Sequence, residues 1–174
     1  MLIRPVQAGD AAGLWRILEP MIRAGDSYPL PRDMREQEAR AYWLQPAHAV
    51  FVVEAEGALL GTYYLRANQT GAGAHVANCG YVTACAATGR GVAQAMCKHS
   101  LEEARRRGFR AMQFNFVLAS NERAVRLWTH MGFATVGRIP EAFDHPTLGL
   151  VDALVMWRAL LQRQTLSPLG EREG

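Results

Sequence analysis

The sequence is poor in cysteine, and the few cysteines present do not form a recognisable site. Cys79, Cys85 and Cys97 are odd in number, and no two of them have the C-x2-C spacing of a metal site. This pattern favours reduced thiols in a cytoplasmic protein over a disulfide framework. We therefore predict that the protein holds no metal and no structural disulfide.

Long apolar runs and a strong charge excess are also missing. No stretch reaches the roughly 18 to 20 apolar residues of a membrane span, and residues 1–5 lack the apolar core of a signal peptide. The formal net charge of +3 is too small to indicate nucleic-acid binding. It would suit an anionic small ligand, and a solvated surface explains it equally well. We expect a soluble cytoplasmic protein without membrane or nucleic-acid partners.

What the sequence does contain is typical of a globular protein. Of its 174 residues, 49% are hydrophobic and 20% are charged, which excludes disordered, collagen-like and coiled-coil chains. We predict one domain over residues 1–160, followed by a flexible tail over 161–174 that is rich in Ser, Pro, Gly and Glu.

Periodicity and turn residues predict the order β-α-α-β-β-β-α-β-α-β-β, and hence one mixed α/β sheet. The expected strands are 2–4, 49–55, 58–66, 75–83, 110–117, 133–139 and 150–157, with a Pro-containing loop over 140–149. The expected helices are 11–24, a second after Asp33 to about 45, a third that follows the turn 88–93 and ends at about 107, and a fourth to 131. Asp10 and Asp33 are the expected caps of the first two helices, and Ser120 or Asn121 is that of the last.

The strongest local signal for function is the turn Thr88–Ala93, between a strand and a helix. Gly89 and Gly91 let the backbone approach a ligand, and free amides at a helix start attract anions. The turn is not a Walker loop, and Gln94 excludes G-x-G-x-x-G. Taken alone, an anion site and a tight strand-to-helix connection are equally supported.

Two segments together resemble the GCN5-related N-acetyltransferases. Thr88-Gly89-Arg90-Gly91-Val92-Ala93 is similar to that family's pyrophosphate loop, Gln/Arg-x-x-Gly-x-Gly/Ala, with Thr88 where Gln or Arg is usual. Residues 121–133 are similar to the pattern Asn-x-x-Ala-x-x-Leu-Tyr-x-x-x-Gly-Phe, with Trp128 in place of Tyr. The resemblance covers nearly the whole chain, and the two motifs are separated by the expected helix and strand.

The resemblance implies a fold, a co-substrate and a set of binding residues. The fold would be a mixed, mostly antiparallel sheet with a splayed parallel pair and helices on both faces. The co-substrate would be acetyl-coenzyme A, and many family members are homodimers. Residues implied to bind it are the diphosphate loop Thr88, Gly89, Arg90, Gly91, Val92 and Ala93, the strand end Val82, Thr83 and Ala84, and Asn121 and Trp128 along the channel. An indole is a poor proton donor, so Trp128 would line the channel rather than protonate the leaving thiolate.

A closer resemblance connects residues 75–81 and 114–117 with the fungal proline-analogue (azetidine-2-carboxylate) N-acetyltransferases. It implies that Asn78 contacts the reacting nitrogen of an amino acid, that backbone near Asn115 receives its carboxylate, and that Tyr81 forms an aromatic wall. Asn in an apolar strand needs a hydrogen-bond partner, and either a substrate or neighbouring backbone and water would serve. Because Asn78 and Tyr81 are three residues apart, sharing one pocket predicts a bulge between them.

The predicted reaction is direct acetyl transfer to a small amine, with a strand amide near Val82 polarising the thioester carbonyl. Glu54 or a water relay is the expected proton acceptor. An acyl-cysteine at Cys79 or Cys85 is disfavoured because no His or Asn is placed to activate a thiol. A protein N-terminus or an antibiotic-like amine stays open as the acceptor. A non-catalytic acyl-coenzyme A sensor is the alternative from another class.

Overall fold

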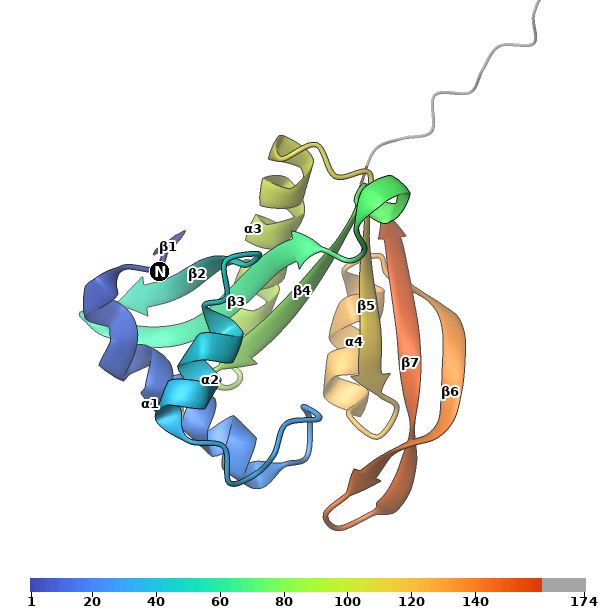
Figure 1. The fold of residues 1–174 in the computed structure, drawn as a ribbon, viewed down its shortest axis with the longest axis horizontal. Helices are drawn as coiled ribbons and strands as arrows, with labels where there is room; N and C mark the ends of the chain where they lie inside the picture. The colour runs from blue at the N-terminus through green and yellow to red at the C-terminus, as the bar shows by residue number, and fades with distance from the viewer. Residues whose placement is uncertain (161–174) are drawn as a thin grey trace, which may run out of the picture.

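The computed structural model describes residues 1–160 and confirms the predicted mixed α/β fold (Figure 1). Its seven strands run in the order β1-β2-β3-β4-β5-β7-β6. The strands are β1 (Leu2–Pro5), β2 (Ala49–Ala55), β3 (Ala58–Ala67), β4 (Val76–Thr83), β5 (Ala111–Leu118), β6 (Ala134–His145) and β7 (Gly149–Ala159). The α-helices are α1 (Ala11–Ala24), α2 (Glu36–Trp43), α3 (Val92–Arg106) and α4 (Glu122–His130). The predicted tail, residues 161–174, lies outside the described residues.

The parallel pair β4–β5 opens after two residue pairs. The strands are in register only at Val76↔Ala111 and Ala77↔Met112, and Figure 1 shows them diverging from that end. All other neighbouring strands are antiparallel. On its other side, β5 carries a register shift against β7 between Phe114 and Val117. Such a bulge bends a strand, so β5 turns away and leaves a gap in the middle of the sheet.

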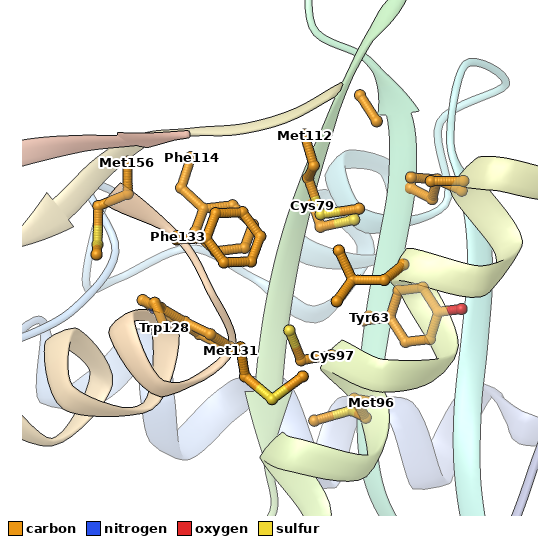
Figure 2. Close-up of a cluster of buried hydrophobic side chains, with 14 of the residues drawn as sticks. Tyr63, Cys79, Met96, Cys97, Met112, Phe114, Trp128, Met131, Phe133 and Met156 are labelled. Atoms are coloured by element: carbon orange, nitrogen blue, oxygen red, sulfur yellow. The ribbon is translucent and has the colours of Figure 1, made fainter. Parts of the chain in front are cut away.

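Helices cover both faces of the sheet, as predicted. Because strand side chains alternate, Tyr63 and Leu65 of β3 join the core under α3 and α4, whereas Tyr64 packs with α1 and α2. Figure 2 shows that the apolar core on the α3–α4 face continues across the gap, with Cys79 of β4 on one side and Phe114 of β5 on the other. The gap is therefore backed by apolar side chains on the α3–α4 face.

Two predicted helix caps do not form their side-chain bonds. Asp10 occupies the N-cap position of α1 as predicted, but its carboxylate makes no capping bond, because it accepts hydrogen bonds from Arg4 at 2.8 Å and from the Gln7 amide at 2.7 Å. The Arg4 guanidinium holds the pKa of Asp10 below its usual range. Helix α2 begins at Glu36 instead of after Asp33, since Glu38 accepts a hydrogen bond from the Arg35 amide and fixes the first turn there.

The predicted loop over 140–149 is mostly strand. β6 continues to His145 and β7 starts at Gly149, so only three residues form the turn. Pro140 is tolerated because β6 is an edge strand and its register shifts between Ile139 and Phe143. The displaced Glu141 amide donates instead to Asp152 Oδ1 at 3.0 Å.

No helix within residues 1–160 is long and apolar enough to cross a membrane. In the same part of the chain, no three His, Cys, Asp or Glu side chains gather as metal ligands would.

Candidate active site

A cavity of about 540 Å³ lies at the gap between β4 and β5. It is lined by residues 78–83 of β4 and 114–118 of β5, and on one side by α1, the loop after it, and Tyr64 and Arg66 of β3. Asn121 and Trp128 line the other side. The cavity thus reaches both faces of the sheet, because no backbone pairing closes the sheet between the splayed strands.

Asn78 bridges the two strands at the point where their pairing ends. Its Nδ2 donates to the Gln113 carbonyl of β5 at 2.9 Å, just beyond the last parallel pair. Its Oδ1 accepts from Nε of Arg66 at 3.4 Å. The side chain is buried, with 6% of its surface exposed. These bonds satisfy the amide within the protein and fix its orientation at the edge of the cavity.

Asn115 also lines the cavity and is also hydrogen-bonded within the protein. Its Nδ2 donates to Oδ1 of Asn68 at 2.7 Å, and its Oδ1 accepts from Nε2 of Gln113 at 2.9 Å. Asn115 lies in the bulged part of β5. Because the strand is irregular there, its backbone is the part of this residue best able to meet a ligand.

The bulge predicted between Asn78 and Tyr81 is absent. Register between β3 and β4 runs without interruption from Gly61↔Thr83 to Ala67↔Ala77, so the two side chains point to opposite faces. Both still line the cavity because the sheet is open beside them. The prediction failed because a bulge in β5, not in β4, opens the site.

The Tyr81 ring lies beside the gap and acts as a wall. Its centroid is 5.0 Å from the Trp128 ring and 5.8 Å from the Phe114 ring. Ser100 Oγ lies 2.7 Å from the Tyr81 hydroxyl and donates to the Cys97 carbonyl, so Tyr81 is the donor in their bond. Burial raises the pKa of Tyr81 well above its usual value, which keeps the hydroxyl neutral.

Backbone alternation in β4 decides which amides reach the gap. The Ala84 amide donates to Leu60 and the Val76 carbonyl accepts from Asn68, both across the β3 ladder. The backbone amides and carbonyls of even-numbered β4 residues therefore bond to β3. Those of the odd-numbered residues point to the opposite side of the strand, toward β5 and the gap. The Val82 amide, predicted to polarise a ligand carbonyl, is thus used by β3. The amides of Tyr81 and Thr83 face the gap instead.

The glycine turn has the backbone geometry of an anion-binding loop. Gly89 and Gly91 have φ values of 84° and 76°, a region that side chains disfavour. Gly91 precedes α3, and no side chain in residues 1–160 caps that helix. Thr88 and Arg90 are exposed, while Val92 and Ala93 start the helix. The first amides of α3 are therefore available to an anion near the gap.

Arg123 lies beside this loop and is not among the residues predicted from the sequence. A Cβ on Gly89 would be 3.9 Å from Nη2 of Arg123, which is exposed and has no carboxylate partner in residues 1–160. Its place two residues after Asn121, in the second motif, was the available signal. Asn121 itself caps α4, since its Oδ1 accepts from the Ala124 amide at 3.1 Å.

Other sequence candidates lie away from the cavity or are inert. Glu54 pairs with Arg4 at 2.8 Å and does not line the cavity, so it is wrong as the proton acceptor. Burial raises the pKa of the Cys79 thiol to about 12, and a neutral thiol is a weak nucleophile. Ala84 does not line the cavity, and both its amide and its carbonyl bond within the protein.

Tyr64 closes the side of the cavity toward α2. Its ring stacks on His48 with 4.0 Å between centroids, and it lies over Gly80, where an added Cβ would be 2.5 Å from the ring. The missing side chain of Gly80 is what lets this ring approach β4.

A seven-stranded mixed sheet, splayed at its parallel pair, with an uncapped helix N-terminus near the gap, is the architecture that the acetyltransferase resemblance implied. Residues 14–133 match the family model described as Acetyltransferase (GNAT) family. The chain therefore belongs to the GNAT acetyltransferase family.

Similar proteins agree with this assignment. A GCN5-related N-acetyltransferase from Kribbella flavida is 38% identical, with a TM-score of 0.86 over 91% of this chain and 96% of that one. The N-acetyltransferase aca1 of Schizosaccharomyces pombe is 26% identical over 70% of this chain and 66% of its own length, so the chain spans just under two thirds of that relative. An acetyltransferase from Salmonella typhimurium, solved with its cofactor acetyl-CoA, has the same fold at 20% identity, with a TM-score of 0.78 over 97% and 98% of the two chains.

Proposed function

We propose that this protein transfers an acetyl group from acetyl-coenzyme A directly to the amine of a small acceptor, an amino acid or an analogue. The observation that carries the proposal is a cavity in the β4–β5 gap with the uncapped start of α3 near one side and the polar side chains Asn78 and Arg66 on the other. A two-sided site of this kind suits two substrates that meet in the middle.

The residues on the α3 side fit the coenzyme. The amides at the start of α3 would receive its diphosphate, with Arg90 and Arg123 supplying positive charge. Within residues 1–160, the amides of Tyr81 and Thr83 are left free for a pantetheine arm lying in the gap, whereas the Tyr81 carbonyl accepts from the Tyr28 hydroxyl at 3.1 Å. Bound there, acetyl-coenzyme A supplies an activated thioester carbonyl. Trp128 packs against Tyr81 as one wall of this channel.

In the proposed reaction the acceptor nitrogen attacks the thioester carbon, a C–N bond forms, and the C–S bond breaks. The amine proton leaves to water, and the departing thiolate takes a proton from solvent. An amide of Tyr81 or Thr83 stabilises the oxygen that becomes negative. Cavity-lining residues of β4 and β5 in the described part of the chain include no carboxylate, which favours a water relay. The buried, neutral thiol of Cys79 disfavours an acyl-enzyme at that residue, whereas Cys85, the other cysteine considered, is exposed and lines the cavity.

The test is a thiol-release assay with acetyl-coenzyme A and a panel of amino acids, proline analogues, diamines and peptides. We expect turnover with a small acceptor. Asn78→Ala should lower acceptor kcat/KM by more than tenfold and leave coenzyme binding near the wild-type value, because Asn78 lies on the acceptor side.

Wild-type turnover by Asn78→Ala would contradict the acceptor assignment. Peptide turnover without amino-acid turnover would select the protein N-terminus as acceptor, and coenzyme binding without turnover on any amine would select a sensor.

Arg123→Gln gives a separate test of the coenzyme side. We expect KM for acetyl-coenzyme A to rise roughly fivefold to tenfold, since a charge-assisted bond to phosphate contributes about 1.5 kcal/mol or more. The matched control is Arg126→Gln, one turn further along α4, where the arginine pairs with Glu122. Equal effects in the two variants, measured in saturation curves at constant ionic strength, would contradict a role for Arg123.

A homodimer stays a prediction of the family resemblance. The hairpin β6–β7 exposes the apolar side chains Val136, Ile139, Leu148 and Leu150, which would suit such a contact.

A further inference from the structure

Few charged side chains line the cavity, and they differ in how deeply they are buried. Among the described lining residues, the only Arg, Lys, Asp or Glu side chains are those of Arg66 and Asp26. Asp26 is exposed on the loop after α1, whereas Arg66 is partly buried on β3 beside Asn78. The interior of the acceptor side therefore holds one positive charge and no negative one to balance it.

Arg66 has no carboxylate partner within residues 1–160, unlike eight other arginines of the same part of the chain. Its one hydrogen bond runs from Nε to Oδ1 of Asn78 at 3.4 Å. That bond leaves the terminal nitrogens of the guanidinium without a partner in this part of the structure. A guanidinium that has lost part of its water is stabilised by an anion.

The surroundings of Arg66 hold its head in place. Asn78 is itself fixed by its bond to the Gln113 carbonyl, so the oxygen that faces Arg66 has a defined position. Tyr64, two residues earlier on the same face of β3, is held by its stack on His48. Burial lowers the pKa of His48, and the charge of Arg66 lowers it further, which leaves this neighbour neutral. None of Asn78, Tyr64 and His48 is therefore an anion that could pair with the Arg66 guanidinium in place of a ligand.

We propose that Arg66, in place of the backbone near Asn115 that the resemblance implied, is the specificity-determining residue that binds a carboxylate of the acceptor and thereby selects amines that carry their own anionic group. The inference rests on the proposed acetyl transfer. A planar guanidinium pairs with both oxygens of a carboxylate, while Asn78 lies beside the amine. Polycationic amines of the antibiotic type are repelled by the same charge.

The experiment compares acceptors matched in the ring and differing at the carboxylate, with kcat/KM referred to the concentration of free amine: L-proline, prolinamide and pyrrolidine, and azetidine-2-carboxylate with azetidine. For wild type we expect kcat/KM to favour the carboxylate member roughly tenfold to hundredfold, the range of a charge-assisted bond. Arg66→Met should reduce this ratio at least tenfold and leave KM for acetyl-coenzyme A at the wild-type value. Arg66→Lys keeps the positive charge but loses the planar guanidinium that can bond both carboxylate oxygens. Its kcat/KM ratio should therefore lie between those of wild type and Arg66→Met.

Arg110→Met is the matched control, because Arg110 is exposed and lines none of the described cavities. It should keep the wild-type ratio. A wild-type enzyme that acetylates prolinamide and pyrrolidine as well as proline would overturn the inference and leave the acetyltransferase proposal intact, even if Arg66→Met does not fold. A folded Arg66→Met with the wild-type ratio of kcat/KM for carboxylate and carboxylate-free acceptors would likewise overturn the inference and leave the acetyltransferase proposal intact. No thiol release with any amine would overturn both.

Discussion

Replacing Trp128 with alanine is expected to lower the free energy of unfolding by about 3–5 kcal/mol, the usual loss for a buried aromatic ring. Trp128 has 9% of its surface exposed and packs against Tyr81 and Phe114, with 5.1 Å between its ring centroid and that of Phe114. These rings come from α4, β4 and β5, so the indole joins the two sides of the gap; Figure 2 shows Trp128 and Phe114. Urea denaturation at constant pH measures the change.

Trp128→Phe is the control, since it keeps an aromatic ring in the same core. We expect it to cost less than half as much and to keep the coenzyme site, whereas Trp128→Ala should also raise KM for acetyl-coenzyme A. A loss below about 1 kcal/mol in the alanine variant would show that the indole is not packed as described. Equal KM values in wild type and both variants would remove Trp128 from the proposed channel.

Gly80→Ala is expected to be the most damaging single-methyl change in the sheet. The added Cβ would lie 2.5 Å from the Tyr64 ring, and that ring cannot move freely because His48 stacks on it and Trp43 contacts its edge. Overpacking of this kind costs about 1–3 kcal/mol. Because Tyr64 lines the acceptor side, kcat/KM for the acceptor should also fall, while coenzyme binding changes little. Thermal melts and saturation curves measure the two effects.

Gly137→Ala is the matched control on another strand, where the new Cβ would lie an ordinary 3.7 Å from Val155. It should change stability by less than about 0.5 kcal/mol. A second test combines Gly80→Ala with Tyr64→Leu, which removes the obstructing ring. If the clash is the cause, the double variant should be more stable than the sum of the single effects predicts. Strict additivity would contradict the mechanism.

Features set by neighbouring residues were predicted well from the sequence. The period of apolar residues and Gly25 gave α1 its observed bounds, Ala11–Ala24. The left-handed glycines of the β2–β3 turn, Gly57, and of the loop before α3 follow from the conformational freedom of glycine. The fold class followed from the order of such elements together with the family resemblance.

Features that depend on a distant partner were predicted poorly. Asp10 fits the pattern of a cap, but Arg4 and the Gln7 amide take its carboxylate. The Pro-containing segment resembled a loop, but an edge position next to β7 allows it to be strand. The bulge was expected in β4 and lies in β5, where it interrupts the pairing with β7.

The sequence by itself therefore determined the elements, their order, the glycine turn and the family of this protein, since each is encoded in contiguous residues. Only the tertiary structure decided the acceptor side of the site. Its hydrogen bonds join residues 12, 35 and 47 positions apart, in Arg66–Asn78, Asn78–Gln113 and Asn115–Asn68. The uncompensated charge of Arg66 is likewise a property of what surrounds it in space, which depends on how the whole sheet splays.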